Sequence, residues 1–405
     1  MHIFTAVRFK LPFIFILSCI LFHVVNGQTS TNIKQLYTDI FTSHQKSVIP
    51  NFNFSQPLEI TVKLFLLTIT RFDEVDETLD TGVAIQTTWN DDGISWKPSS
   101  YGNAESIVVP HTDIWTPKLV LLNSIETYEP LGGDNDLLGT VRHNGSSTII
   151  VGDVLSSKCT PNIYKFPFDS QTCQLLFVVW GSTINDIHLK ADPDPVDINF
   201  FKPNSDWTLQ SYQGETYLWH GYDVFEISLT IKRAPLYYNI VVSCPTILFG
   251  LSNPLVFLLP VESGERVGLS ITVLLSYAIF LTIVQMAVPA SSNPMSLLLV
   301  FMIVTIALSG IIVAVAIYIS SLYYRDPQSK MNNILKYIGS RRHGIKRLIA
   351  VDPESETIEK GNVKYSTEMN ITWKDVCDEL DTCMMVISYC IITFIICLYF
   401  IIVSV

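Results

Sequence analysis

Charged residues are scarce in this chain of 405 residues, and they are distributed unevenly. Asp, Glu, Lys and Arg make up 16% of the sequence, against roughly a quarter in an ordinary soluble domain. No charged residue occurs in the stretches 234–261, 267–324 and 382–405. The net charge of −11 excludes a nucleic-acid-binding protein that relies on overall basic charge. The 48% of hydrophobic residues excludes a disordered chain.

The three uncharged stretches predict four membrane-spanning helices. A helix needs about 20 apolar residues to cross a bilayer, so the first and last stretches fit one span each. The turn-forming residues at 289–294 divide the middle stretch into two. The predicted spans are 237–259, 267–286, 296–322 and 383–404. Buried helices of a soluble protein are the alternative interpretation.

The two ends of the predicted bundle differ in charge, which sets its orientation. Residues 1–27 have the basic start, short apolar run and small final residues of a secretory signal peptide, with a membrane anchor as the alternative. The stretch 325–347 holds seven basic residues and one acidic residue, and positive charge marks the cytoplasmic side. We therefore predict a multi-pass membrane protein with five regions. They are a signal peptide (1–27), an extracellular domain (28–233), three spans (234–324), a cytoplasmic loop (325–382) and a last span (383–405).

The predicted extracellular domain is acidic and rich in β-forming runs. Between residues 28 and 232 it holds 25 Asp and Glu against 12 Lys and Arg, a balance of −13. Turn-rich stretches separate its short apolar runs, a spacing that predicts an all-β, immunoglobulin-like sandwich. The clearest runs are 58–70, 83–89, 147–155, 174–180 and 222–231.

Cysteine is scarce in the same domain. Of eight cysteines in the sequence, only Cys159 and Cys173 fall in it, and in an oxidising compartment they are each other's natural partners. Two Asn-X-Ser sequons, at Asn53 and Asn144, predict N-linked glycans. The sequence shows no nucleophile elbow, phosphate-binding loop or cluster of metal ligands. We therefore predict no enzyme activity, no cofactor and no metal site.

One face of the second predicted span suits a pore. Positions three and four residues apart share a helix face, and this face is small and polar at its cytoplasmic end and apolar further out. The positions are Gly268, Thr272, Leu275, Ile279 and Ile283. Copies arranged around an axis would form apolar rings that gate by dewetting, above a ring of Glu265 carboxylates that favours cations. The alternative is a helix packed against its neighbours, with Glu265 only at its N-terminus.

A short motif between the two extracellular cysteines carries a family resemblance. Thirteen residues separate Cys159 from Cys173 and include Phe166-Pro-Phe-Asp169. This pattern resembles the signature of the Cys-loop receptors, the pentameric neurotransmitter-gated ion channels. The stretch Ser263-Gly-Glu-Arg266, followed by Ile271-Thr-Val-Leu-Leu275, is similar to the cation-selective branch of nicotinic acetylcholine receptors. The resemblance covers nearly the whole chain after the signal peptide.

The resemblance implies a fold and a pore. It implies an extracellular sandwich joined to a four-helix transmembrane bundle, assembled as a pentamer of homologous subunits in the plasma membrane, with a postsynaptic position among the options. It assigns cation selectivity to Glu265 and the gate to Leu275. Gly268 departs from the hydroxyl residue common at the narrowest ring, so calcium permeability does not follow from the resemblance.

The resemblance also implies a ligand site, although this sequence lacks some of the aromatic residues that form it. Trp180 matches the central Trp of the aromatic box that holds a quaternary ammonium, and Tyr222 matches the outer Tyr. Either Tyr217 or Trp219 could supply a further ring. Leu122 stands where the family has a box Tyr, and Ala84 stands where it has a Trp on the adjoining subunit. A buried Trp of the sandwich core is the alternative for Trp180.

Further residues match the family's coupling between ligand site and pore. Arg233 ends the last predicted strand, and the resemblance pairs it with Glu74 of the first strand-connecting loop. Pro167 and Phe168 of the disulfide loop, and Pro289 after the second span, match the remaining interface. The alternative for Arg233 is a side chain solvated among lipid headgroups.

We therefore predict a subunit of a cation channel that a small extracellular amine, such as acetylcholine, opens. Its partners would be homologous subunits, in a homomeric or heteromeric pentamer, together with membrane lipids and permeant cations, and no nucleic acid. An accessory subunit without its own ligand site and a channel gated by another amine are the alternatives. A tetraspan adhesion or transport protein would share the four spans but would not need the pore face and Glu265. The amphipathic, basic stretch 331–349 is expected on the anionic inner leaflet.

Overall fold

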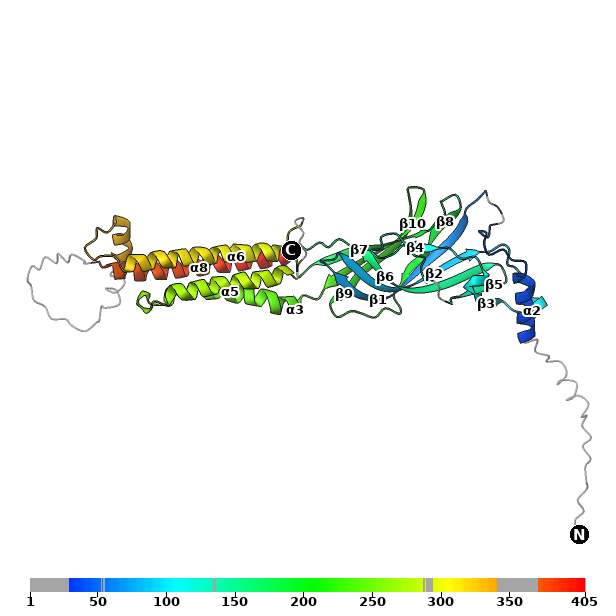
Figure 1. Ribbon diagram of the computed structural model, residues 1–405, viewed down its shortest axis with the longest axis horizontal. Helices are drawn as coiled ribbons and strands as arrows, with labels where there is room; N and C mark the ends of the chain where they lie inside the picture. Colours follow the sequence, from blue (N-terminus) through cyan, green and yellow to red (C-terminus); the bar gives the residue numbers. More distant parts are fainter. Residues whose placement is uncertain are drawn as a thin grey trace, which may run out of the picture.

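The protein has a β-sheet half and a helical half joined end to end (Figure 1). This computed structural model describes residues 29–51, 53, 55–133, 136–286, 288, 294–340 and 371–404. The predicted signal peptide, Pro289 and most of the predicted cytoplasmic loop lie outside these residues. The last strand, β10 (Tyr222–Arg233), leads directly into the first helix of the helical half, so the change from an acidic to an uncharged sequence coincides with the change of fold.

Two sheets form the β-sheet half, which confirms the predicted sandwich. The larger sheet runs in the order β3-β5-β6-β2-β1-β8 and the smaller in the order β4-β7-β10-β9. The strands of the larger sheet are β1 (Leu58–Asp73), β2 (Thr78–Asn90), β3 (Ser106–Pro110), β5 (Leu138–Arg142), β6 (Ser146–Lys158) and β8 (Ile187–Asp197). The strands of the smaller sheet are β4 (Leu119–Leu121), β7 (Ser170–Val179), β9 (Trp207–Trp219) and β10 (Tyr222–Arg233).

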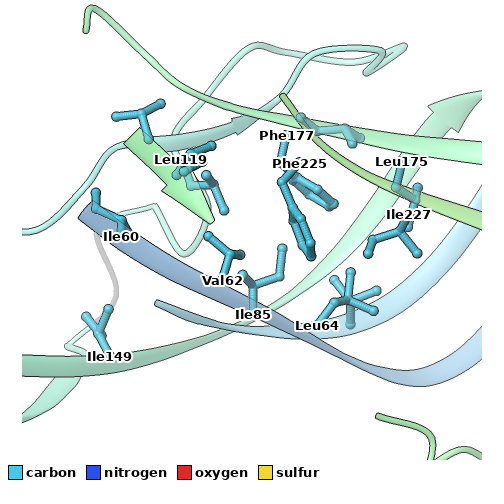
Figure 2. Packing of buried hydrophobic residues seen from close by; sticks show 14 of the residues in the cluster. Ile60, Val62, Leu64, Ile85, Leu119, Ile149, Leu175, Phe177, Phe225 and Ile227 are labelled. Atoms are coloured by element: carbon cyan, nitrogen blue, oxygen red, sulfur yellow. The ribbon is translucent and has the colours of Figure 1, made fainter. Parts of the chain in front are cut away.

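The core lies between the two sheets and follows from the alternation of side chains along the strands. In β1 every second residue from Leu58 to Leu66 is buried, because successive side chains of a strand point to opposite faces. Figure 2 shows Val62 and Leu64 of β1 facing Phe177 of β7 and Phe225 of β10. Full burial of each such side chain stabilises the fold by roughly 1.5–3 kcal/mol.

Among the residues that the structure describes, four helical segments are long and apolar enough to cross a membrane, as predicted. The first, Leu236–Leu258, is irregular because Pro245 and Pro254 each remove a backbone donor and start a new helical piece. Its pieces are α3 (Leu236–Tyr238), the π-helical η3 (Asn239–Ser243), α4 (Cys244–Ser252) and η4 (Asn253–Leu258). The other three spans are α5 (Arg266–Met286), α6 (Leu297–Tyr323) and α8 (Trp373–Ser404).

The α8 helix begins ten residues before the predicted span, at Trp373. Its first turns carry charged side chains, which end the uncharged run in the sequence without ending the helix. The remaining helical elements are short. They include α2 (Ser30–Phe41), η1 (Pro98–Tyr101), η2 (His111–Asp113) and η5 (Val261–Ser263). Residues 333–340, within the predicted amphipathic stretch 331–349, are also helical, and the rest of that stretch after residue 340 lies outside the described residues.

Candidate functional site

An exposed aromatic cluster lies at one end of the smaller sheet. The antiparallel register of β7 and β10 pairs Phe177 with Phe225, and Trp180 and Tyr222 each lie three residues from this pair, toward the same end of the sheet. The amide N–H of Trp180 donates to the carbonyl of Lys118 at 2.8 Å, which fixes the end of β7 against the stretch leading into β4. Trp180 is 56% exposed, so it is not a residue of the sandwich core.

The β9–β10 hairpin adds three more rings on the outer face of this sheet. Tyr222 pairs with Trp219, and Val224 pairs with Tyr217. These positions alternate with the core residue Phe225, so Tyr217, Trp219 and Tyr222 point away from the core, and all three are exposed. The structure therefore brings the three predicted ligand-site residues, Trp180, Tyr217 and Tyr222, to one face.

A fifth ring, Tyr128, was missed by the sequence analysis. It stacks on Trp180 with ring centroids 6.3 Å apart and planes 18° from parallel. Tyr128 lies in the loop after β4, six residues beyond the Leu122 that replaces the expected box Tyr, and spacing alone could not align it. We call Tyr128, Trp180, Tyr217, Trp219 and Tyr222 the aromatic cluster.

A carboxylate adjoins the aromatic cluster on the outer face of β10. Glu226 accepts hydrogen bonds from Gln174 at 2.6 Å and from Ser228 at 3.0 Å. Partial burial, and then the hydrogen bond to Glu226, raise the pKa of Tyr217 above its ordinary value. Aromatic faces beside a carboxylate suit an organic cation.

The hairpin tip is tied to the body of the domain. His220 and Gly221 both have positive φ, at 49° and 87°, which is the two-residue turn that matches strand twist. The Gly221 carbonyl accepts from the amide of Ile184 in the β7–β8 loop at 3.1 Å. The tip is therefore short and tethered.

The opposite face of the domain has no ring at Ala84. This residue is half-buried on β2, where its neighbours in the sheet are Phe65 and Gly152. The Lys63 ammonium lies 5.6 Å from the Phe65 ring centroid. Phe65 and Lys63 therefore lie near the position where the resemblance leads us to expect a Trp.

A buried arginine forms the junction between the two halves. Arg233, at the end of β10, is 3% exposed, so it is not a headgroup-solvated side chain. Its guanidinium donates to both oxygens of Asp169, at 2.8 and 3.1 Å, and forms an ion pair with Glu74. We call Arg233, Asp169 and Glu74 the coupling centre.

Three rings enclose this guanidinium. Their centroids lie 4.3 Å away for Trp207, 4.9 Å for Phe166 and 5.1 Å for Tyr238. Burial lowers the pKa of Arg233, but the hydrogen bonds and charges of the two carboxylates outweigh it and raise the pKa above its ordinary value. The arginine therefore stays charged at neutral pH.

The loop between Cys159 and Cys173 packs against the helices of the bundle. Cys159 and Cys173 are joined, and Ile163 and Phe166 between them are buried in a cluster with residues of the spans. The carbonyl of Tyr164 accepts from the amide of Leu297, the first residue of α6, at 3.0 Å. The loop thus links the sandwich directly to the bundle.

Two of the predicted interface residues lie at this junction. Pro167 is buried, and the half-buried Phe168 packs on the same cluster of helix residues. Phe166 and Asp169 of the same motif, for which no role was predicted, also lie here: Phe166 packs on the helix residues and Asp169 binds Arg233. Pro289 lies outside the described residues, so its predicted contact stays a prediction.

The α5 helix has two unlike faces. Its buried side chains are Arg266, Ser270, Tyr277 and Val284. At about 100° per residue, the predicted pore face lies on the opposite side of the helix. Its positions, Gly268, Thr272, Leu275, Ile279 and Ile283, are all exposed. Glu265 is exposed just before the helix, next to Gly264, whose φ of 73° makes the turn into it.

Both predicted glycosylation sites are accessible. Asn53 precedes β1 and Asn144 lies in the β5–β6 turn, and both are exposed. Each side-chain oxygen accepts from the amide of its sequon Ser, at 3.1 and 3.2 Å. Within the described part of the chain, no three His, Cys, Asp or Glu side chains gather as metal ligands.

Comparison with protein families covers both halves. Residues 33–235 match the model for the neurotransmitter-gated ion-channel ligand binding domain, and residues 242–372 match the one for the neurotransmitter-gated ion-channel transmembrane region.

Among curated relatives, the chain is similar to acetylcholine receptor subunits. It is 29% identical to acetylcholine receptor subunit beta-type unc-29 of Caenorhabditis elegans, over 79% of this chain and 65% of the relative. It is 29% identical to acetylcholine receptor subunit alpha of Danio rerio, over 73% and 66%. For neuronal acetylcholine receptor subunit alpha-6 of Rattus norvegicus the identity is 28%, over 73% and 60%. The matches thus span a little less than two thirds of these relatives' length.

Proposed function

Because this chain belongs to the neurotransmitter-gated ion-channel family, we propose that it is a subunit of a cation-selective channel opened by a small extracellular amine such as acetylcholine. Its copies, or copies with homologous subunits, form a pentamer with α5 lining the pore. Residues 28–233 lie outside the cell after removal of the signal peptide, and residues 325–382 lie in the cytoplasm.

The exposed face of α5 is the observation that carries this proposal. Leu275, Ile279 and Ile283 are each more than half exposed in the single chain, while the opposite face is buried. A row of exposed apolar side chains is typical of a surface that contacts another protein surface or the membrane. Rings of these side chains around an axis give a dry constriction, which supports a gate at Leu275 and Ile279.

Cation selectivity is proposed from Glu265 and the charge of the sandwich. Glu265 is exposed at the end of α5 that adjoins the basic loop, so five copies would ring the cytoplasmic mouth with carboxylates. The extracellular domain, with its balance of −13 between residues 28 and 232, would concentrate cations above the pore.

Cysteine substitution along α5 tests which face lines the pore. We expect Thr272→Cys and Leu275→Cys channels to lose most of their current to a charged thiol reagent applied while the channel is open. Ser270→Cys is the matched control, because Ser270 is 2% exposed on the buried face. Equal reaction rates at all three positions would contradict a pore lined by the Thr272–Leu275 face.

The aromatic cluster is the proposed amine site, and Tyr128 is its most specific test. An exposed ring contributes roughly 0.5–1 kcal/mol to holding a cation and a desolvated ring about 2 kcal/mol. We therefore expect Tyr128→Ala to raise the dissociation constant for acetylcholine about 2- to 30-fold. Phe200→Ala, which removes an exposed ring in the β8–β9 loop, should leave it unchanged. Equal effects of the two variants would exclude Tyr128 from the site.

An accessory subunit is the second candidate function. The missing indole at Ala84 favours it for the face that an adjoining subunit's ligand would meet. Current only on co-expression with a ligand-binding subunit, with no acetylcholine binding to this chain alone, would support the accessory role. Binding of a different amine by this chain would instead support a channel with another transmitter.

A further inference from the structure

A basic pocket lies where α6 ends and α8 begins. These helix ends lie at the end of the bundle away from the sandwich (Figure 1). The volume of the pocket is about 620 Å³, within the range of small-molecule sites. Four of its lining residues are charged, and all four are basic: Arg325, Lys330, Lys336 and Lys374. Among the described residues, no Asp or Glu lines it.

The wall of the pocket contains a buried donor without an acceptor. Trp373, the first residue of α8, is 5% exposed, and its indole N–H has no hydrogen-bond partner. The Arg325 guanidinium lies 5.5 Å from the centroid of the same ring. Buried donors are normally satisfied, so an acceptor that reached this N–H from the pocket would gain a hydrogen bond.

The neighbouring carboxylates are already engaged. Glu262 accepts from Lys374 at 2.8 Å and from the hydroxyl of Tyr323. Asp375 accepts from the Thr372 hydroxyl at 2.6 Å, which caps the start of α8. These contacts hold one of the four basic side chains, Lys374, at the rim and leave the charge of the pocket positive.

The position of the pocket along α6 and α8 also sets its depth relative to the membrane. Tyr323 is the last residue of α6 and Trp373 is the first residue of α8, and both helices are long and apolar enough to span the membrane. Because the uncharged stretch that contains α6 ends at Tyr324, the proposed topology puts a pocket beside Arg325 within reach of the inner-leaflet head groups.

We infer that this pocket binds a polyphosphorylated head group, of the kind carried by inositol lipids of the inner leaflet. The inference rests on the proposed cytoplasmic position of residues 325–382. The lysines and Arg325 would pair with the phosphates, and the Trp373 N–H would donate to a phosphate oxygen. Neither contact needs the ligand site or the pore to function as proposed.

The test is a count of bound lipid on the full-length protein in nanodiscs, by native mass spectrometry. The nanodiscs contain phosphatidylinositol bisphosphate or, in a second series, an equal charge of phosphatidylserine. We expect the phosphoinositide to be retained preferentially. Lys330→Gln with Lys336→Gln should reduce its binding about tenfold or more, because each lysine near the surface contributes electrostatic attraction.

Two further variants distinguish specific binding in the pocket from non-specific electrostatic attraction of anionic lipid. Trp373→Phe keeps the ring and removes only the donor, so a severalfold loss of phosphoinositide is expected. Lys165→Gln with Lys232→Gln removes the same charge beside the opposite membrane surface and should change nothing. Equal retention of the two lipids, or full retention by the Lys330/Lys336 variant, would overturn the inference.

Soluble inositol trisphosphate distinguishes the source of the head group. If it competes only at concentrations far above the lipid's, the ligand is the membrane lipid. If it competes at matching concentrations, the ligand is the free inositol phosphate. Because the readout is binding, these outcomes are independent of whether the channel conducts.

Discussion

Arg233→Gln is expected to remove most of the functional channels from the cell surface. The substitution keeps a polar side chain of similar length but leaves Asp169 and Glu74 facing each other without their cation. Removal of one partner from a buried ion pair costs about 3–5 kcal/mol, against a total stability of about 5–15 kcal/mol for a typical protein. The junction between sandwich and bundle would lose its central contact.

Surface biotinylation and thermal unfolding of the purified protein measure this effect. Lys232→Gln is the matched control, because Lys232 is the preceding residue of β10 and is exposed, and it should unfold at the wild-type temperature. Arg233→Lys should fall between the two, since lysine keeps the charge but loses the planar fork that meets both oxygens of Asp169. Wild-type unfolding of Arg233→Gln would show that the coupling centre contributes little.

Leu275→Ser is expected to give channels that conduct at rest. In the proposed pore, Leu275 forms the first apolar ring above Thr272, and a dry ring blocks ions because it excludes water. A hydroxymethyl side chain in each copy is smaller and wettable, so the closed state loses its advantage. We expect a large current without ligand that a pore blocker suppresses.

Leu269→Ser is the control on the same helix. Leu269 is 39% exposed but lies about 120° from Leu275 around the helix, because the two residues are six positions apart. The two variants differ only in which side of α5 becomes polar. A resting current of equal size in both would place the gate elsewhere.

The architecture was predictable because it depends on long, redundant patterns. Loss of charge over some 20 residues marks a span wherever it occurs, and alternation marked the central strands of the sandwich. The strand β8 was not predicted. It contains Pro193 and Pro195, and proline is unfavourable inside a strand. Its place at the sheet edge tolerates them.

The candidate sites were predictable only where a short motif fixes the alignment. Cys159, Trp180 and Arg233 stand at fixed distances from recognisable residues, so their partners could be named. Tyr128 reaches Trp180 from a loop of unmatched length, and no spacing rule could place it. The role of Asp169 needed three-dimensional geometry, since only the structure shows that both of its oxygens meet Arg233.

The reversal potential of the current tests the central claim most directly. Oocytes expressing the chain, alone or with a partner subunit, would be recorded in full and in diluted external sodium chloride. The proposed channel predicts a reversal potential that follows the sodium gradient, and Glu265→Ala should weaken that dependence. A reversal potential that follows the chloride gradient in the wild-type channel would contradict the account.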